Sequence, residues 1–477
     1  MKGSFLLNKW RAMPAGARSS VVFALSSFIL KGISFLTTPI FTRLLEPAHY
    51  GIIATYNSWQ SIIEVFALLG LTSAGVFNVG LNDYKNDRNR YVSVVLTVCN
   101  LITLCTFGVI FGLKALIGPD FLLPYDLLAV MFIYFIFSPA TVFWVTRQRY
   151  EYKYRAAFAV TVLSTVVSQG ASVVCVMLMD GDPVSVKIWS GVLAGLIFQI
   201  PIYLMLYGRG RCFFDGGIWK SVLAFAIPLL PHYLAQHVMA GSDKIMISEL
   251  YSESAAGIYA VVANISLIAT VVWSAVNASL IPFTFERINE KKYKDIDRVV
   301  FPILLVYAVV CIGVALAAPE VLMILAPEEY YSGIYAVPPI IAVAFLSALY
   351  NVYANVEFYH KRSGSIALAT IVAATVNIGL NLVLIPTMGF VGAAYTTLIS
   401  NVILVAMHYF GYRRCQKERA YGDGRIILLG VACVALCLAC NLLYINNAVR
   451  YCVLGAALIA VFIKRKALIG LVKSLKK

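Results

Sequence analysis

Uninterrupted apolar runs of membrane-spanning length recur from one end of the sequence to the other. A helix rises 1.5 Å per residue, so about 20 apolar residues cross the hydrocarbon core of a bilayer. The runs are continuous rather than alternating, which disfavours a β-barrel. Hydrophobic residues make up 61% of the 477 residues and charged residues only 13%, a balance unlike that of soluble domains. The sequence therefore predicts an all-α polytopic membrane protein with about fourteen transmembrane helices.

The first two apolar runs carry charges at the same predicted depth. Lys31 and Glu64 each lie about 21 Å from the polar turn that joins the runs, and the second run is continuous from Tyr50 to Gly80. Charges inside a membrane are expensive, so they mark functional positions. Asn57 and Gln60 extend the face of Glu64. We expect Lys31 and Glu64 to line one cavity, placed to form an ion pair; a salt bridge that only holds two helices together is the alternative.

The basic residues alternate from one connection to the next. All but six of the 38 Lys and Arg residues fall on every second connection or at the two ends of the chain. The positive-inside rule therefore places both termini, residues 1–18 and the basic tail 465–477, in the cytoplasm. The formal charge of +15 then reflects topology and a secondary attraction to anionic lipids, so nucleic-acid binding is not predicted.

The sequence offers no constellation typical of an enzyme or a primary pump. No connection is long enough to fold as a separate domain, and no GxxxxGK[ST] motif for ATP is present. Cys437 and Cys440 form a C-x-x-C inside an apolar run, where packing is the expected role and no metal is predicted. We therefore predict neither catalysis nor a cofactor, with a membrane polymerase or ligase as the alternative from another class.

The sequence also contains a weak internal repeat. A shift of 206 residues aligns the segment around Gly51 with the segment around Gly257, as LLEPAHYGIIA against LYSESAAGIYA. Six runs intervene, so both copies keep the same orientation, as in transporters that hold substrate between two parallel lobes. We expect lobes at residues 19–210 and 216–412, each of six helices, and two further helices in 425–464.

The seventh run contains an unusual concentration of polar residues. Pro228 and Pro231 are expected to kink or partly unwind this helix within the membrane. Its polar residues are His232, Gln236, His237, Asp243 and Lys244. The histidines can titrate in a proton-coupled cycle, and helix packing is the equal alternative. Asp243 and Lys244 lie near the outer end of the run, where anchoring at the membrane interface is a good alternative to a functional role.

Other polar residues lie near the ends of runs or in amide pairs. Arg43 can snorkel at the outer end of the first run, and Arg147 and Arg149 close the fourth run in a string that suits an interface or a pyrophosphate. For Glu357, His360, Lys361 and Arg362 we favour a topological role. The pairs Asn351/Asn355 and Asn377/Asn381 are expected to hold helices together.

Three stretches resemble one family of transporters. They are TRLLEPAHYGIIATY (42–56), SDKIMISELYSESAAGIYAVVANIS (242–266) and NIGLNLVLIPTMGFVGAAYTTLIS (377–400). Their order and the number of runs resemble the polysaccharide-transporter family of the multidrug/oligosaccharidyl-lipid/polysaccharide superfamily. The resemblance covers about residues 15–440.

The resemblance implies two six-helix lobes around a central cavity, in the bacterial inner membrane. It also implies a flippase that moves undecaprenyl-pyrophosphate-linked oligosaccharide units outward by alternating access, for O-antigen, capsule or exopolysaccharide synthesis. The lumen of such proteins is often cationic, which Lys31 fits; this lumen is only sparsely basic, and Glu64 suggests a less acidic glycan. An H⁺ or Na⁺ gradient or the membrane potential is the expected energy source. Membrane lipids, the polysaccharide polymerase and the chain-length machinery are the expected partners.

The candidate substrate-binding residues are Lys31, Arg43, Asn57, Gln60, Glu64, Arg147, Arg149, His232, Gln236, His237, Asp243 and Lys244. Two related functions stay open at this point. One is an ion-coupled multidrug exporter of the same superfamily, and the other is a flippase for the peptidoglycan precursor.

Overall fold

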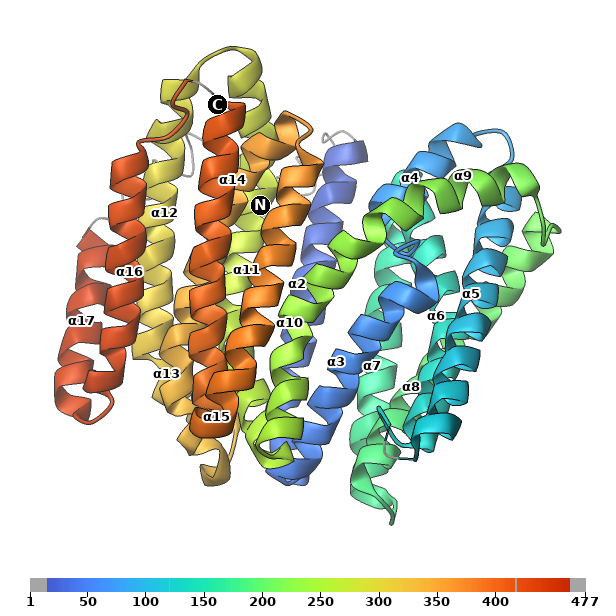
Figure 1. Cartoon of the computed structure of the whole chain (residues 1–477), viewed down its shortest axis with the longest axis horizontal. Helices are drawn as coiled ribbons and strands as arrows, with labels where there is room; N and C mark the ends of the chain where they lie inside the picture. Colours follow the sequence, from blue (N-terminus) through green and yellow to red (C-terminus); the bar gives the residue numbers. More distant parts are fainter. Residues whose placement is uncertain (1–14, 120, 417, 464–477) are drawn as a thin grey trace, which may run out of the picture. The chain divides into compact units, whose positions relative to one another are not determined.

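The computed structural model describes residues 15–119, 121–416 and 418–463 (Figure 1). The tail 465–477 and most of the expected N-terminal segment 1–18 lie outside these residues. The described residues form helices joined by short connections, and no strand occurs among them. The predicted all-α architecture is therefore confirmed.

The chain divides into two compact units, which are described separately. Unit 1 comprises Met1–Leu44 and Tyr56–His237, and unit 2 comprises Leu45–Thr55 and Val238–Lys477. Two helices contribute to both units: α3 (Pro47–Leu68) and α10 (Leu230–Leu250). The lobe boundaries expected from the repeat, 19–210 and 216–412, stay a prediction.

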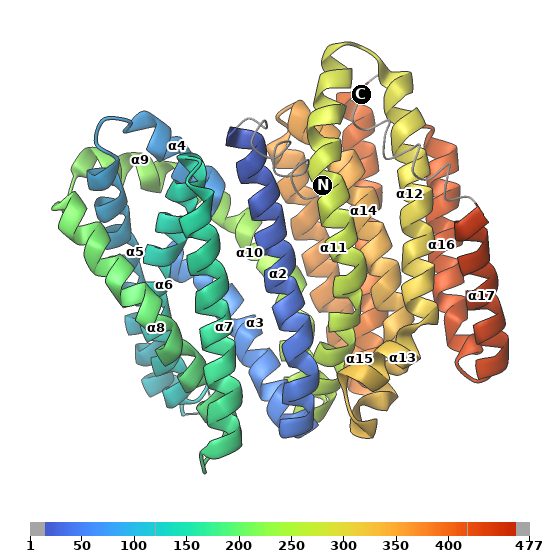
Figure 2. The same ribbon diagram turned by 180° about the vertical axis from the view of Figure 1, so that it is seen from behind.

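Unit 1 is a bundle of long apolar helices with two short helices at one end. Its further elements are α2 (Ala15–Leu44), α4 (Ala74–Asp83), α5 (Arg88–Ile117), α6 (Tyr125–Tyr150), α7 (Tyr154–Leu178), α8 (Pro183–Gly210), α9 (Gly216–Ala226) and the 3₁₀ helix η1 (Ile227–Leu229). α8 packs against α5, α6 and α7, and α2 packs against α7. Both ribbon views show α5, α6 and α8 side by side (Figures 1 and 2).

Unit 2 is built around one buried helix. Its further elements are α11 (Glu253–Asn289), α12 (Tyr293–Leu316), α13 (Ala318–Leu325), the 3₁₀ helix η2 (Glu328–Ala336), α14 (Val337–Tyr359), α15 (Ser363–Cys415), α16 (Asp423–Leu443) and α17 (Asn447–Ile463). α14 packs against α11, α12, α15 and α16, and most of its side chains are buried. An all-round apolar helix of this kind is expected at the centre of a bundle.

Eleven helices within the described residues are long and apolar enough to cross a membrane. The exact count of about fourteen is not confirmed, and three helices explain the difference. α15 covers two of the expected spans. They meet at Gly389, whose φ of 56° and ψ of −140° are not helical. α3 and α17 are not among the eleven.

The second expected run is wrong in its extent. It was expected to continue to Gly80, but α3 ends at Leu68 and α4 begins at Ala74. Leu69 and Gly70 have positive φ values of 48° and 65°, which stop the helix. The ring of Tyr233 occupies this position, since a Cβ on Gly70 would lie 2.6 Å from Tyr233 Cδ2. Tyr233, 163 residues later in the sequence, therefore packs at this helix end.

The expected distortion in the seventh run is present. Residues Ile227–Leu229, which contain Pro228, form a 3₁₀ turn between α9 and α10. Proline removes a backbone donor and clashes with the preceding turn, so the α-helical pattern is interrupted there.

The two glycines aligned by the internal repeat meet in unit 2. A Cβ on Gly51 would lie 1.9 Å from the backbone oxygen of Glu253, and a Cβ on Gly257 would lie 2.0 Å from that of Pro47. Pro47 and Glu253 are themselves related by the 206-residue shift. The contact is therefore reciprocal, like an isologous interface about a two-fold axis. Only glycine lets the first turns of α3 and α11 approach this closely.

Candidate functional site

Asp243 is the centre of a buried polar cluster in unit 2. It lies on α10 and is 5% exposed. Its Oδ1 accepts a hydrogen bond from Asn381 Nδ2 at 2.7 Å. Its Oδ2 accepts from Tyr259 Oη at 2.9 Å and from Thr397 Oγ1 at 2.6 Å. These partners come from α11 and from both sides of the Gly389 break in α15.

A second layer of amides and hydroxyls supports this cluster. Asn381 Nδ2 also donates to Asn377 Oδ1 at 3.2 Å, and Asn377 Nδ2 donates to Thr397 Oγ1 at 3.2 Å. Ser242 Oγ donates to Asn377 Oδ1 at 3.3 Å, and Thr396 Oγ1 donates to Asn381 Oδ1. The Asn377/Asn381 pair does hold helices together, as expected, and it also surrounds a carboxylate.

The Asp243 cluster has no basic partner in direct contact. None of the ion pairs formed by the described residues includes Asp243, although Lys244 follows it on α10. Three hydrogen bonds stabilise the Asp243 carboxylate, and its buried negative charge would be stabilised further by a bound cation or proton. The side-chain oxygens of Asp243, Asn377, Asn381, Thr397 and Tyr259 are hard donors of the kind that hard cations prefer. The cluster is thus chemically suited to a small cation or a proton.

The surroundings of Asp243 differ from one expectation drawn from the sequence. Interfacial anchoring is wrong for this residue, because the side chain is buried among hydroxyls and amides. Sequence reasoning also missed Tyr259 and Thr397 as its neighbours. Tyr259 and Thr397 lie 16 and 154 positions after Asp243, and helix packing brings both hydroxyls to its carboxylate.

The expected ion pair between Lys31 and Glu64 is not formed. The ion pairs among the described residues include neither of them, and Glu64 Oε1 accepts from Thr72 Oγ1 at 3.4 Å. Thr72 reaches Glu64 because the chain turns back after α3. Equal depth along two helices does not make side chains face one another. That Lys31 and Glu64 line one cavity stays a prediction.

The other candidates occupy varied surroundings. Asn57, Gln236 and Arg149 are exposed, whereas Gln60, His232, His237 and Lys244 are partly buried. Arg43 is exposed and its Nη1 donates to the backbone oxygen of Pro39 at 2.8 Å. Nδ1 of His232 is buried without a hydrogen-bond partner. Their roles in substrate binding stay predictions.

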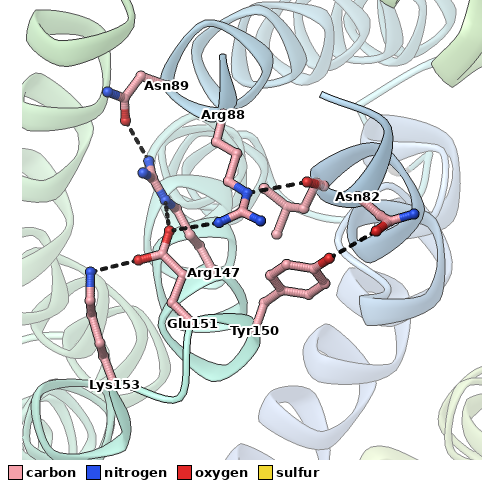
Figure 3. Close-up of polar contacts among 8 residues, drawn as sticks. Asn82, Arg88, Asn89, Arg147, Tyr150, Glu151 and Lys153 are labelled. Atoms are coloured by element: carbon pink, nitrogen blue, oxygen red, sulfur yellow. Dashed lines mark hydrogen bonds and ion pairs between the residues drawn. The ribbon is translucent and has the colours of Figure 1, made fainter. Parts of the chain in front are cut away.

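Glu151 gathers basic residues at one end of unit 1 (Figure 3). Its Oε1 accepts from Arg147 Nε at 2.8 Å and lies 3.8 Å from Arg88 Nη1, and its Oε2 lies 2.7 Å from Lys153 Nζ. Arg147 Nη1 also donates to Asn89 Oδ1 at 2.6 Å. The guanidinium of Arg147 therefore joins the first turn of α5 to the end of α6. A role of Arg147 at the membrane interface or at a pyrophosphate stays a prediction.

We expect Glu151→Gln to lower the thermal stability of the protein at neutral pH. Burial raises the pKa of Glu151, but hydrogen bonds from Arg147 and Lys153 and their charges outweigh it, so the pKa lies below the ordinary 4.5. A depressed pKa stabilises the fold above that ordinary value, and the contribution is lost as pH falls through the folded-state pKa. Thermal unfolding in detergent at pH 7 and pH 4 measures this: the variant should unfold earlier at pH 7 and approach wild type at pH 4. Asp87→Asn, at an exposed pair, is the control and should change little. A deficit that is equal at both pH values would contradict the prediction.

A second buried acid in unit 2 is Glu357, for which the sequence indicates only a role in topology. Glu357 Oε2 lies 2.5 Å from His408 Nδ1, and both side chains are almost fully buried. Ser365 Oγ donates to Glu357 Oε1. A carboxylate next to a helix end gives no sequence sign that a histidine 51 positions later will reach it, so only the packing of α14 against α15 identifies the pair.

Comparison with known proteins identifies the family. The model of the family described as "Polysaccharide biosynthesis protein" matches residues 17–288. The Lsg locus putative protein 1 of Haemophilus influenzae is 21% identical over 410 residues, which are 84% of this chain and 98% of that protein. An uncharacterized membrane protein of the same organism is 21% identical over 370 residues, which are 76% of this chain and 88% of that protein.

Solved structures with a similar fold are membrane transporters. The lipid II flippase MurJ in an inward closed conformation has a TM-score of 0.67 at 11% identity, covering 94% of this chain and all of that one. An inward-facing multidrug resistance MATE transporter of the MOP superfamily has a TM-score of 0.58 at 14% identity, covering 83% and 98%. At these identities the likeness concerns the fold alone. The chain belongs to the polysaccharide biosynthesis protein family and has the polytopic helical fold of MOP superfamily transporters.

Proposed function

We propose that this protein is a flippase for lipid-linked oligosaccharides in polysaccharide synthesis. Its substrate would be an oligosaccharide repeat unit on undecaprenyl pyrophosphate, moved from the inner to the outer leaflet of a bacterial inner membrane. The observation that carries the proposal is the match to polysaccharide biosynthesis proteins on a fold shared with transporters.

The architecture supports transport over catalysis. No connection between consecutive helices in the described ranges is longer than Gly118–Pro124. A membrane polymerase or ligase would need a larger extramembrane segment to hold its acceptor. A transporter needs only helices, since its task is to carry a polar headgroup through hydrocarbon that isolated charges cannot cross.

Alternating access would follow from the internal repeat. Two lobes that rock against each other would present polar residues such as Lys31 first to one leaflet and then to the other. The polyprenyl tail would stay in the lipid, and only the headgroup would need a protein-lined path. In this proposal both termini are cytoplasmic, and the polysaccharide polymerase and chain-length machinery would receive the product.

The Asp243 cluster is our candidate site for the coupling cation. Its oxygen donors would hold Na⁺, or Asp243 would carry a proton. The membrane potential supplies about 2.3 kcal/mol per charge per 100 mV to a cation that moves inward. Because the ligands come from α10, α11 and both sides of the α15 break, occupancy would bias the arrangement of these helices.

The test is a gene deletion in the bacterium that carries this protein, with complementation by the full chain. We expect deletion to remove surface polysaccharide and to leave lipid-linked repeat units in the cytoplasmic leaflet. The wild-type gene should restore both. An intact glycan with increased drug sensitivity would instead indicate a multidrug exporter, and arrested peptidoglycan synthesis would indicate a precursor flippase.

A further inference from the structure

A polar pocket lies inside unit 1, in the middle of the membrane-spanning helices. It has a volume of about 220 Å³ and lies among α6, α7 and α8. The polar side chains that line it are Tyr134, Ser164, Thr165, Ser168, Gln169 and Gln199. On α7 and α8 these residues are several turns from either helix end, where hydrocarbon would surround an ordinary surface helix.

The lining of this pocket is polar but uncharged. Its residues are hydroxyls, amides, small residues and Val192, and no Lys, Arg, Asp or Glu lines it. The hydroxyls are anchored by backbone oxygens, because Ser168 Oγ donates to Gly191 at 2.6 Å and Thr165 Oγ1 donates to Thr161 at 2.9 Å. Their lone pairs stay available as acceptors. Such a lining fits a ligand that both donates and accepts hydrogen bonds and carries no charge.

One amide in the pocket lacks a partner. Gln199 Oε1 is buried and accepts no hydrogen bond within the protein. A buried acceptor of this kind is costly unless a ligand or water satisfies it. Because the Gln199 side chain also lines the pocket, a turn of its amide would present this acceptor to a ligand hydroxyl.

Two glycines provide the space. Gly191 and Gly195 lie one turn apart on α8 and both line the pocket. A Cβ on Gly195 would approach Gln199 Nε2 to 3.3 Å, and one on Gly191 would lie 2.7 Å from Ser172 Oγ. A larger residue in place of Gly195 would crowd the amide of the pocket, whereas one in place of Gly191 would clash with Ser172 on α7. The volume falls below the roughly 300–1,000 Å³ of pockets for drug-sized ligands, so it suits a single ring.

We propose that this pocket binds one uncharged sugar ring of the transported glycan. The inference rests on the proposed flippase function and adds a sugar-recognition site to it. Neutral hydroxyls and amides match the hydroxyl groups of a sugar, whereas a pyrophosphate would need cations and an organic cation would need a carboxylate. The pocket therefore contributes to selection of the glycan and not to binding of its lipid phosphate.

The test compares two probes on the purified full chain in nanodiscs. One probe is the lipid-linked repeat unit extracted from the host, and the other is undecaprenyl pyrophosphate without sugar. Gln199→Met and Gln169→Met keep side-chain length and remove the amides. We expect each to weaken binding of the glycosylated probe about tenfold, or 1.4 kcal/mol, and to leave the bare pyrophosphate unchanged.

The controls separate the possible outcomes. Ser190→Ala removes a hydroxyl on the same helix that donates to the backbone oxygen of Val186 and does not line the pocket. It should bind both probes as wild type does. Gly195→Leu fills the pocket without removing a polar group and should reproduce the selective loss; thermal unfolding in detergent checks that each variant is folded.

Equal weakening for both probes, or no weakening for either, would overturn the sugar site. Failure of the wild-type protein to bind the glycosylated probe would instead count against the proposed flippase function. The two failures are therefore distinguishable.

Discussion

Replacing Asp243 by asparagine is expected to slow translocation strongly while the protein remains folded. Asparagine keeps the shape of the side chain and removes the charge that a cation or proton would neutralise. With the amide oxygen in the place of Oδ2, Tyr259 and Thr397 can still donate to it, and only the hydrogen bond from Asn381 is lost. Coupling free energies between sites are typically 1–3 kcal/mol, so we expect a fall of about 5–150-fold in the rate of glycan delivery. Surface polysaccharide in the complemented deletion strain measures this rate.

The same variant distinguishes a cation site from a purely structural carboxylate. A cation that binds only the folded protein raises stability by about 2.7 kcal/mol at 100 times its Kd. Na⁺ should therefore raise the unfolding temperature of the wild-type protein in detergent and leave that of Asp243→Asn unchanged.

Glu249→Gln is the matched control for Asp243→Asn. Glu249 lies on the same helix but is exposed. Its neutralisation should change neither transport nor the response to Na⁺. Normal transport by Asp243→Asn at normal membrane abundance would contradict the coupling role of the cluster.

Replacing Gly51 or Gly257 by valine is expected to have the second large effect. Each new side chain would point into backbone that cannot move aside, at 1.9 Å from Glu253 O or 2.0 Å from Pro47 O. Overpacking of this kind costs about 1–3 kcal/mol and forces the helices apart. We expect a lower unfolding temperature and loss of transport, with both valine variants alike because the contact is reciprocal.

Gly313→Ala provides the control for these two variants. Gly313 lies within α12 of the same unit, and a Cβ there would meet nothing within 4 Å. Alanine is a better helix former than glycine, so this variant should be neutral or slightly stabilising. A valine variant at Gly51 that is as stable and active as Gly313→Ala would show that the close crossing is dispensable.

Features set by local composition could be predicted from the sequence. Apolar length identified the helices of both units, and Pro228 marked the 3₁₀ turn before α10. The repeat aligned Gly51 with Gly257, although their direct contact with one another was not predicted. Periodicity and proline act within a few residues, so they are readable without a tertiary structure.

Features set by contacts between distant residues could not be predicted. α3 ends at Leu68, and the ring of Tyr233 packs against Gly70 just after this end. Asp243 is buried because Asn381 and Thr397 fold back onto it across the break at Gly389. Lys31 and Glu64 share a depth but not an ion pair, since depth along a helix does not fix the direction in which a side chain points. In such a chain the sequence shows which polar residues lie within apolar helices. Only the tertiary packing shows which side chains they contact.

Reconstitution would test the central proposal most directly. The purified protein in proteoliposomes would be given a lipid-linked oligosaccharide in one leaflet and, separately, a fluorescent organic cation, each with an imposed cation gradient. The flippase account predicts protein-dependent movement of the oligosaccharide lipid to the other leaflet, strongly slowed by Asp243→Asn, and no transport of the organic cation. Transport of the organic cation without movement of the glycolipid would contradict the account and assign the protein to drug export.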